Sequence, residues 1–159
     1  FPGSTGAGKT FLCNCIAKEL MEQNHSVIYL SAIELFDIMA QSKVRHTEDV
    51  MINELYDRIF DCDLLIIDDL GMEKITEFYL ANLFDLINRR LTDQKSVIIT
   101  TNLSLNTLQN PEDLVHQRIY DRVLEMCVPV QFHGKSLRGA LAREKFDALA
   151  KSMEVNAHE

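Results

Sequence analysis

The sequence predicts an α/β fold in which a mainly parallel sheet lies between two layers of helices. Two observations indicate this class. Short apolar segments rich in β-branched residues alternate along the chain with longer segments of helical periodicity. A glycine-rich loop near the start of the chain is followed at once by an amphipathic helix. Parallel strands need such crossover helices, because a tight turn cannot join them.

Four strands are predicted within the sequence. Three of them are short, apolar and β-branched, as expected for strands that are buried on both faces of a parallel sheet. The four segments are Ser26–Leu30, Leu64–Asp68, Ser96–Thr101 and Val128–Phe132. A glycine-rich loop of this kind follows directly on a central strand. We therefore expect Phe1 to be the end of a fifth, central strand that is largely missing, and the natural protein to extend further upstream.

Several segments carry helix start signals or helical periodicity. Ser31 and Ser104 are suited to cap helices, and Glu34 completes a capping box with Ser31. From Thr76 to Thr92, apolar residues recur at intervals of three and four, which predicts one buried helical face. Further helices are predicted from Lys9 to about Gln23, from Thr47 to Phe60, from Pro111 toward Met126 and from Ser136 to about Met153.

Composition indicates one globular domain, residues 1–159. Hydrophobic residues make up 47% and charged residues 25%, which excludes a disordered chain. No apolar run could cross a bilayer and no signal peptide opens the chain, so we expect a cytoplasmic protein with no membrane partner. The net charge of −8 argues against a surface built for duplex DNA. The cysteines, at positions 13, 15, 62 and 127, match no metal-site spacing and are interpreted as buried thiols.

The loop at residues 3–10 matches the phosphate-binding pattern G-x-x-x-x-G-K-[ST] at every fixed position. Its glycines allow successive N–H groups to curl around a phosphate, and the following helix presents its positive end to the same anion. Lys9 is expected to reach the β- and γ-phosphates in binding and catalysis, while the Thr10 hydroxyl ligates Mg²⁺. The predicted nucleotide-binding residues are Gly3, Ser4, Thr5, Gly6, Ala7, Gly8, Lys9, Thr10 and Phe11.

A buried strand that ends in two carboxylates supplies the second half of this site. Asp68 and Asp69 come at the carboxyl edge of the predicted sheet, where ligands of open α/β folds bind. Asp68 is expected to hold Mg²⁺ through water, and Asp69 to polarise the attacking water. Asn102 follows the next strand, so its amide is expected to sense the γ-phosphate and help to hold that water. By itself, Asn102 could equally cap or turn the chain.

Four segments together resemble the DnaC/DnaI-type helicase loaders, a family of AAA+ P-loop ATPases. They are Gly3–Thr10, Leu64–Gly71, Ile98–Leu103 and Gln117–Val123. The resemblance implies a three-layer α/β/α fold of the AAA+ type with a five-stranded sheet. It implies ATP and Mg²⁺ as cofactors and self-association through the nucleotide site. It also implies single-stranded DNA and the replicative helicase hexamer as partners, the helicase being delivered onto the DNA.

The same resemblance implies roles for three further side chains. Asn102 corresponds to the first sensor, Arg122 to the arginine finger that completes the site of a neighbouring copy, and Arg138 to the second sensor. Gln117 stands where the family often has an acid, which leaves the local geometry open. Asp69 is one methylene shorter than the Glu usual in fast AAA+ ATPases, so slow hydrolysis is expected.

Several alternatives stay open. IstB-type transposition helper ATPases share the segments around Arg122 and Arg138, and would have a transposase as partner. A binding switch with negligible turnover would share the phosphate loop. A small-molecule kinase would too, but we find no substrate lid in the sequence. Arg122 could also be a surface arginine paired with Asp121 or Glu125. The basic run 41–46 is either a DNA contact or, more in keeping with such runs, a solvated turn.

Overall fold

The computed structural model describes residues 1–44, 50–71, 76–111 and 114–133, together with residues 136, 139, 143, 145 and 146. Within them the strands are β1 (Val27–Ser31), β2 (Leu64–Leu70) and β3 (Ser96–Thr101). The helices are α1 (Lys9–Glu22), α2 (Ala32–Val44), α3 (Val50–Asp61), α4 (Glu77–Thr92), α5 (Leu105–Gln109) and α6 (Leu114–Met126). The first three predicted strands and the helices around them are therefore confirmed.

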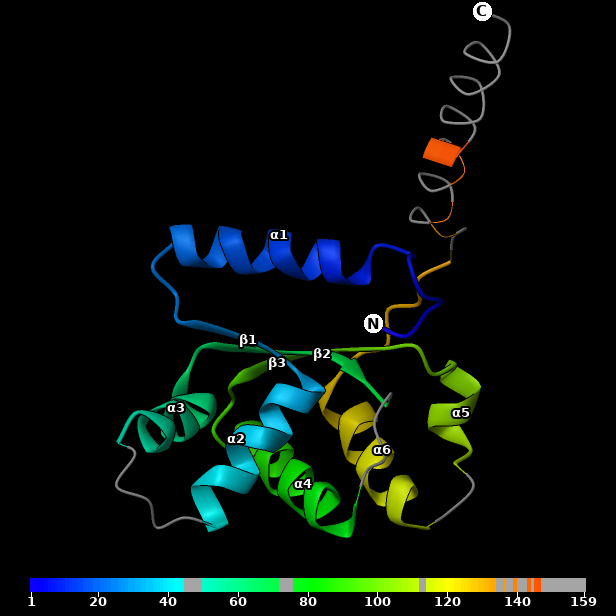
Figure 1. The fold of residues 1–159 in the computed structure, drawn as a ribbon. Coiled ribbons are helices and arrows are strands. Elements are labelled where there is room, and N and C mark those ends of the chain that lie inside the picture. The colour runs from blue at the N-terminus through cyan, green and yellow to red at the C-terminus, as the bar shows by residue number, and fades with distance from the viewer. Residues whose placement is uncertain are drawn as a thin grey trace, which may run out of the picture.

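β2 lies at the centre of a parallel sheet with the order β1-β2-β3 (Figure 1). Leu64 pairs with Val27 on one side and with Ser96 on the other, so the three strands begin level with one another. The first five residues of β2 are all buried, which explains why its sequence is apolar up to the acid pair. The parallel arrangement brings the carboxyl ends of the three strands to one edge of the sheet.

The backbone of Phe1–Gly3 lies between β3 and Phe132 and extends this sheet. On one side its first amino group donates a hydrogen bond to the carbonyl oxygen of Ile99, at 2.7 Å. On the other side the N–H of Phe132 donates to the carbonyl oxygen of Pro2, at 2.9 Å. These contacts give the start of the chain a central place in the sheet, as the sequence predicts for Phe1.

The fourth predicted strand, Val128–Phe132, is not formed as a strand. Phe132 makes a single parallel bridge, with Gly3. Pro129 lacks the N–H that a strand ladder needs. The predicted five-stranded sheet is therefore observed as three strands extended by two bridged segments.

α1 covers one face of the sheet, and α2 to α6 lie on the other (Figure 1). Beneath α1, Cys13 and Ala17 pack against Leu64 and Ile66 of β2. The opposite face of β2 joins the larger core, which α2 to α6 complete. The predicted three-layer arrangement is confirmed. Among the described helices, none has the length and hydropathy that crossing a bilayer requires.

Polar side chains cap the amino-terminal ends of several helices. Ser31 and Glu34 form the predicted capping box: the Ser31 N–H donates to the Glu34 carboxylate at 2.8 Å, and the Glu34 N–H donates back to Ser31 Oγ at 3.2 Å. Thr76 and Ser104 each accept a hydrogen bond from the N–H three residues on. Ser136 does the same at 3.1 Å. Most of the helix predicted after it lies outside the described residues.

The described residues also leave out parts of other predicted features. The helix predicted from Thr47 is observed from Val50, as α3, and the helix predicted from Pro111 is observed from Leu114, as α6. Arg138 and the basic side chains of the run 41–46 lie outside the described residues. Their predicted roles therefore stay predictions.

Arg90 fastens α4 to the amino edge of the sheet, away from the acid pair. Its side chain is fully buried. The guanidinium donates to the carbonyl oxygens of Ile59, Phe60 and Cys62 at the end of α3, and to that of Ser96 in β3, at 2.7–3.1 Å. The last carbonyls of a helix have no partner within the helix, and a cation there also opposes the helix dipole. Arg90 thus joins three elements of the core.

Candidate nucleotide-binding site

The loop Gly3–Gly8 leads directly from the sheet edge into α1. Gly8 caps α1 with a φ of 96°, a left-handed conformation that glycine adopts without strain. Gly3 is needed for a different reason, because a Cβ atom there would lie 2.7 Å from the carbonyl oxygen of Phe132. α1 begins at Lys9, so the unpaired N–H groups of its first turn adjoin the loop. The backbone therefore has the form of an anion cradle.

The middle of the loop lies close to Ser136. A Cβ atom on Gly6 would lie 2.2 Å from Ser136 Oγ, so the two residues are in close contact. Thr5 is exposed and Ala7 is partly buried. Phe11, on the first turn of α1, is 74% exposed. All the predicted loop residues thus lie on one short stretch of chain at the carboxyl edge of the sheet.

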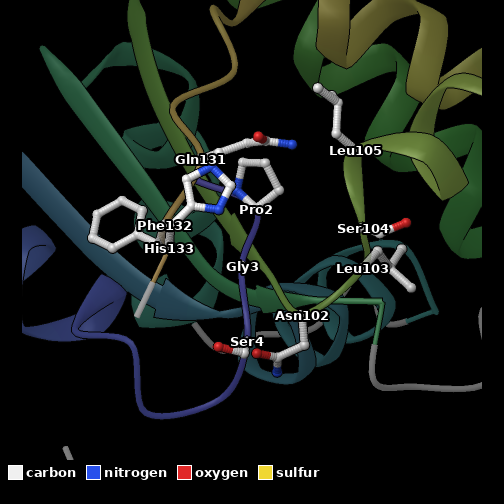
Figure 2. Close-up of a pocket in the computed structure, with 10 residues that line it drawn as sticks. All are labelled: Pro2, Gly3, Ser4, Asn102, Leu103, Ser104, Leu105, Gln131, Phe132 and His133. Atoms are coloured by element: carbon white, nitrogen blue, oxygen red, sulfur yellow. The ribbon is translucent and has the colours of Figure 1, made fainter. Parts of the chain in front are cut away.

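Lys9 links the loop to the end of β3. Its side chain is 5% exposed. Nζ donates to the carbonyl oxygens of Gly3 and Ser4, at 2.7 and 3.0 Å, and to Asn102 Oδ1, at 2.9 Å. Figure 2 shows the side chains of Ser4 and Asn102 close together. The predicted phosphate-binding lysine and the predicted sensor are therefore in direct contact.

Asp68, near the end of β2, receives hydrogen bonds from hydroxyl groups on three elements. Thr10 donates to Asp68 Oδ2 at 3.1 Å, Tyr29 donates to the same oxygen at 2.7 Å, and the buried Thr100 donates to Oδ1. Burial and the hydrogen bond to Asp68 raise the pKa of Tyr29 well above its ordinary value, so its hydroxyl stays a donor. Tyr29 and Thr100 were not predicted from the sequence, because both residue types are ordinary in strands.

Asp69 is held in an unusual backbone conformation. Its φ is +59°, in the left-handed region, at an irregularity in the pairing of β2 with β3. The Asp69 N–H donates to Thr100 Oγ1 at 2.9 Å, and its carboxylate accepts from Asn102 Nδ2 at 3.3 Å. Such irregularities re-aim a side chain and are frequent beside active sites. Asn102 thus contacts both Lys9 and Asp69, so these three predicted residues lie together.

The arrangement of these groups fits a nucleoside triphosphate with Mg²⁺. Mg²⁺ takes few protein oxygens and completes its shell with water and phosphate oxygens. The Thr10 hydroxyl and the Asp68 carboxylate lie 3.1 Å apart and offer oxygen donors of this kind. No cluster of three or more His, Cys, Asp and Glu forms within the described part of the chain. A magnesium ion at this site would be held by the Thr10 hydroxyl and, through water, by the Asp68 carboxylate, with phosphate and water completing its shell.

A pocket of about 470 Å³ opens beside the loop (Figure 2). Its walls come from the start of the loop at Ser4, from the segment between Asn102 and Leu105 after β3, and from the residues around His133. Leu103 and Leu105 give it apolar walls, whereas Ser4 and Asn102 are polar. Of the proposed catalytic and metal-holding residues that the structure describes, only Asn102 lines this pocket; Lys9, Thr10, Asp68 and Asp69 are not among its lining residues.

Arg122 makes its described contacts on α4 and α6. Its guanidinium pairs with Glu125 and lies 5.7 Å from the centre of the Phe84 ring. The side chain is 40% exposed. Gln117, on the first half of the same helix, is exposed. The described contacts of one chain do not bring Arg122 to the phosphate loop, so a role at the phosphates would need a second copy.

Comparison with models of protein families matches residues 1–145 to the family described as IstB-like ATP binding protein. The match takes in the phosphate loop, Asp68, Asp69, Asn102 and Arg122. The chain belongs to the IstB-like ATP-binding proteins. Nucleotide binding is therefore a property of its family, in agreement with the form of the loop.

Curated relatives of this IstB-like chain include two replicative helicase loaders. It is 23% identical over 149 residues to DnaC of Escherichia coli (strain K12), which covers 92% of this chain and 58% of DnaC. It is 23% identical over 146 residues to DnaI of Bacillus subtilis (strain 168), which covers 86% of this chain and 46% of DnaI. The chain spans about half the length of the curated relatives it matches.

Solved structures agree with the fold. The crystal structure of the DnaC helicase loader matches with a TM-score of 0.67 at 22% identity, over 84% of this chain and 76% of that one. The crystal structure of DnaI matches with a TM-score of 0.65 at 26% identity, over 84% and 69%. AMPPCP-bound DnaA from Aquifex aeolicus matches with a TM-score of 0.62 at 26% identity, over 92% and 43%. The predicted P-loop AAA+ fold and the resemblance to helicase loaders are confirmed.

Proposed function

We propose that this chain is the ATP-binding and ATP-hydrolysing AAA+ module of a DNA replication protein that loads the replicative helicase onto single-stranded DNA. One observation carries the proposal: Asn102 joins Lys9 to Asp69, directly beside the contact between Thr10 and Asp68. Membership of an ATP-binding family supports the nucleotide. The relatives named as replicative helicase loaders support the wider role.

Each residue has a distinct task in this proposal. Lys9 neutralises charge on the β- and γ-phosphates, while Thr10 and Asp68 hold Mg²⁺. When bound, Mg²⁺ supplies charge neutralisation on the phosphate oxygens. Asp69 orients and polarises the attacking water. Asn102 forms hydrogen bonds with both Lys9 and Asp69, so it holds the phosphate-binding group and the water-polarising group in fixed positions relative to each other.

The proposed site is composite, with Arg122 of one copy completing the site of its neighbour. A guanidinium is permanently charged and presents a rigid fork of donors, which suits the charge that spreads over the γ-phosphoryl oxygens. In a single chain Arg122 pairs with Glu125, an exposed contact worth only about 0.3–0.5 kcal/mol. Exchange of this weak pair for phosphate oxygens would cost little. Self-association would therefore control turnover.

A transposition helper ATPase is the second candidate, and the name of the matched family favours it. The chemistry would be the same, but the partner would be a transposase instead of the replicative helicase hexamer. Binding of the full-length protein to each purified partner, in the presence of ATP, separates the two. Retention by the helicase alone supports loading, and retention by the transposase alone supports transposition.

Phosphate release, measured with and without single-stranded DNA, tests the proposed reaction. Asp69→Asn is expected to keep ATP bound and to stop hydrolysis, whereas Asp68→Ala is expected to weaken Mg²⁺-dependent binding. An equal loss of affinity in both variants would contradict the division of tasks. Tight ATP binding by the wild-type chain without phosphate release, with or without DNA, would instead favour a binding switch.

A further inference from the structure

Tyr29 places a hydroxyl group on the carboxylate that is proposed to hold Mg²⁺. It belongs to β1, the strand beside β2, and its hydroxyl donates to Asp68 Oδ2 at 2.7 Å. Thr10 donates to the same oxygen from the start of α1, at 3.1 Å. Thr100 donates to Oδ1 from β3, on the opposite side of β2. Hydroxyls from both neighbouring strands thus hold the two oxygens of Asp68.

The ring of Tyr29 is held in place by apolar packing. It packs against the smaller apolar cluster beneath α1, which includes Cys13 and Ile66. A tyrosine fits such a position because its body is apolar and its hydroxyl can still reach a polar partner. The ring fixes the hydroxyl in place, and the hydroxyl then fixes the orientation of the Asp68 carboxylate.

Thr100 and Tyr29 differ in one respect that matters for a test. Thr100 Oγ1 also accepts a hydrogen bond from the Asp69 N–H, so a change there would disturb both acidic residues. The hydroxyl of Tyr29 donates to Asp68, and no contact with Asp69 is among those described for it. Removal of that one oxygen atom therefore affects the proposed metal site, Asp68 and the Thr10 hydroxyl beside it, and leaves the hydrogen bond of the Asp69 N–H in place.

We propose that Tyr29 is a positioning residue for Mg²⁺, which acts by holding Asp68 in the orientation that binds the ion. The inference rests on the proposed function, in which Asp68 and Thr10 hold Mg²⁺. Hydrogen-bond partners of metal-holding side chains orient them, and their loss commonly reduces metal affinity or activity by about 10–100-fold. Thr10 and Thr100 still contact Asp68 when Tyr29 is changed, so the expected loss lies at the lower end of that range.

The experiment is a Mg²⁺ titration of nucleotide binding by Tyr29→Phe, with a non-hydrolysable ATP analogue followed by calorimetry. The Mg²⁺ concentration for half-maximal binding is expected to rise about 10-fold. Binding of the same analogue in excess EDTA is expected to stay at the wild-type level, because the phosphate loop is untouched. Tyr56→Phe is the matched control, since Tyr56 is a half-buried tyrosine on α3 whose ring packs edge-to-face with that of Phe60. Its titration should match that of the wild type.

A double-mutant cycle keeps the inference testable if Tyr29→Phe also lowers stability. If Tyr29 acts through Asp68, adding Tyr29→Phe to Asp68→Asn should leave the Mg²⁺ dependence of Asp68→Asn unchanged. Independent, additive effects would overturn the inference. So would a Tyr29→Phe titration that coincides with the wild type. If nucleotide binding by the wild-type chain does not depend on Mg²⁺, the proposed metal site itself is overturned. That result is seen in the wild type, whereas failure of the role of Tyr29 is seen only in the comparison of Tyr29→Phe with the wild type.

Discussion

Replacing Thr100 with valine should destabilise the chain and disturb the acid pair together. Thr100 is fully buried, and valine has nearly the same shape, so the change leaves no cavity. It removes a hydrogen bond to the charged Asp68 carboxylate and leaves the Asp69 N–H without its acceptor. A hydrogen bond to a charged group contributes about 1.5–3 kcal/mol, and the loss of the acceptor of the part-buried Asp69 N–H costs toward the lower end of the roughly 1–3 kcal/mol for an unsatisfied buried donor. Because Tyr29 and Thr10 still contact Asp68, the expected loss is about 2–4 kcal/mol.

Thermal unfolding followed by circular dichroism measures this loss. For a domain of this size, each kcal/mol lowers the melting temperature by about 2–4 °C. Thr100→Val should therefore melt about 5–15 °C below the wild type. The same variant should need more Mg²⁺ to bind nucleotide, because the Asp68 carboxylate is less well held.

Thr101→Val is the matched control for this experiment. Thr101 is the next residue of β3, is 4% exposed, and also makes two hydrogen bonds, to the Leu70 carbonyl and from the Leu103 N–H. It should lose stability and keep the wild-type Mg²⁺ dependence. A Thr100→Val chain within about 0.5 kcal/mol of the wild type, with normal Mg²⁺ dependence, would refute the reasoning.

Three further predictions concern residues outside the hydrogen-bond network of the acid pair. Arg90→Met should destabilise the chain by about 3–5 kcal/mol, because it leaves buried carbonyl oxygens without a hydrogen-bond donor. Denaturant unfolding measures this loss, and the nucleotide affinity of the folded fraction should not change. Arg122→Ala should bind ATP but hydrolyse it poorly alone, and added Asp69→Asn chains should restore some phosphate release. Normal ATP hydrolysis by Arg122→Ala alone would contradict the role of Arg122 as an arginine finger. Burial, with the nearby charge of Asp68, raises the pKa of Cys13 to about 11, so at pH 8 its thiolate fraction should be about 100-fold below that of an ordinary thiol. Iodoacetamide should therefore modify the exposed Cys15 first. Cys13 should become reactive only as the pH rises toward 11. Rapid modification of Cys13 at pH 8 in the folded chain would contradict the raised pKa and the burial of its thiol.

Local patterns were enough to predict the phosphate loop and the acid pair. Gly3–Gly8 and Lys9 are read from fixed spacing, and Asp68 and Asp69 from an apolar strand that ends in carboxylates. Asn102 was predicted to lie at this site because parallel strands place their carboxyl ends at the same edge of the sheet. The observed contact of Asn102 with Lys9 and Asp69 follows from that rule.

Partners supplied by distant parts of the chain could not be predicted in this way. Tyr29 and Thr100 look like ordinary strand residues, and only the register of three strands brings them to Asp68. Arg90 looks like a solvated residue at the end of a helix, yet it is fully buried beneath the end of α3. Cys15 was predicted to be buried and is exposed, because it is two residues from Cys13 and so faces away from the sheet.

Equilibrium binding of ATP to Lys9→Ala tests the central claim most directly. Lys18→Ala is the control, since Lys18 lies on the same helix with its side chain 76% exposed. Lys9→Ala is expected to fold, as judged by its circular dichroism spectrum, and to lose detectable ATP binding, because the charge of Lys9 contributes to phosphate binding. Lys18→Ala should bind as the wild type does. A folded Lys9→Ala chain that binds ATP as tightly as the wild type would contradict the assignment of Gly3–Thr10 as the nucleotide site.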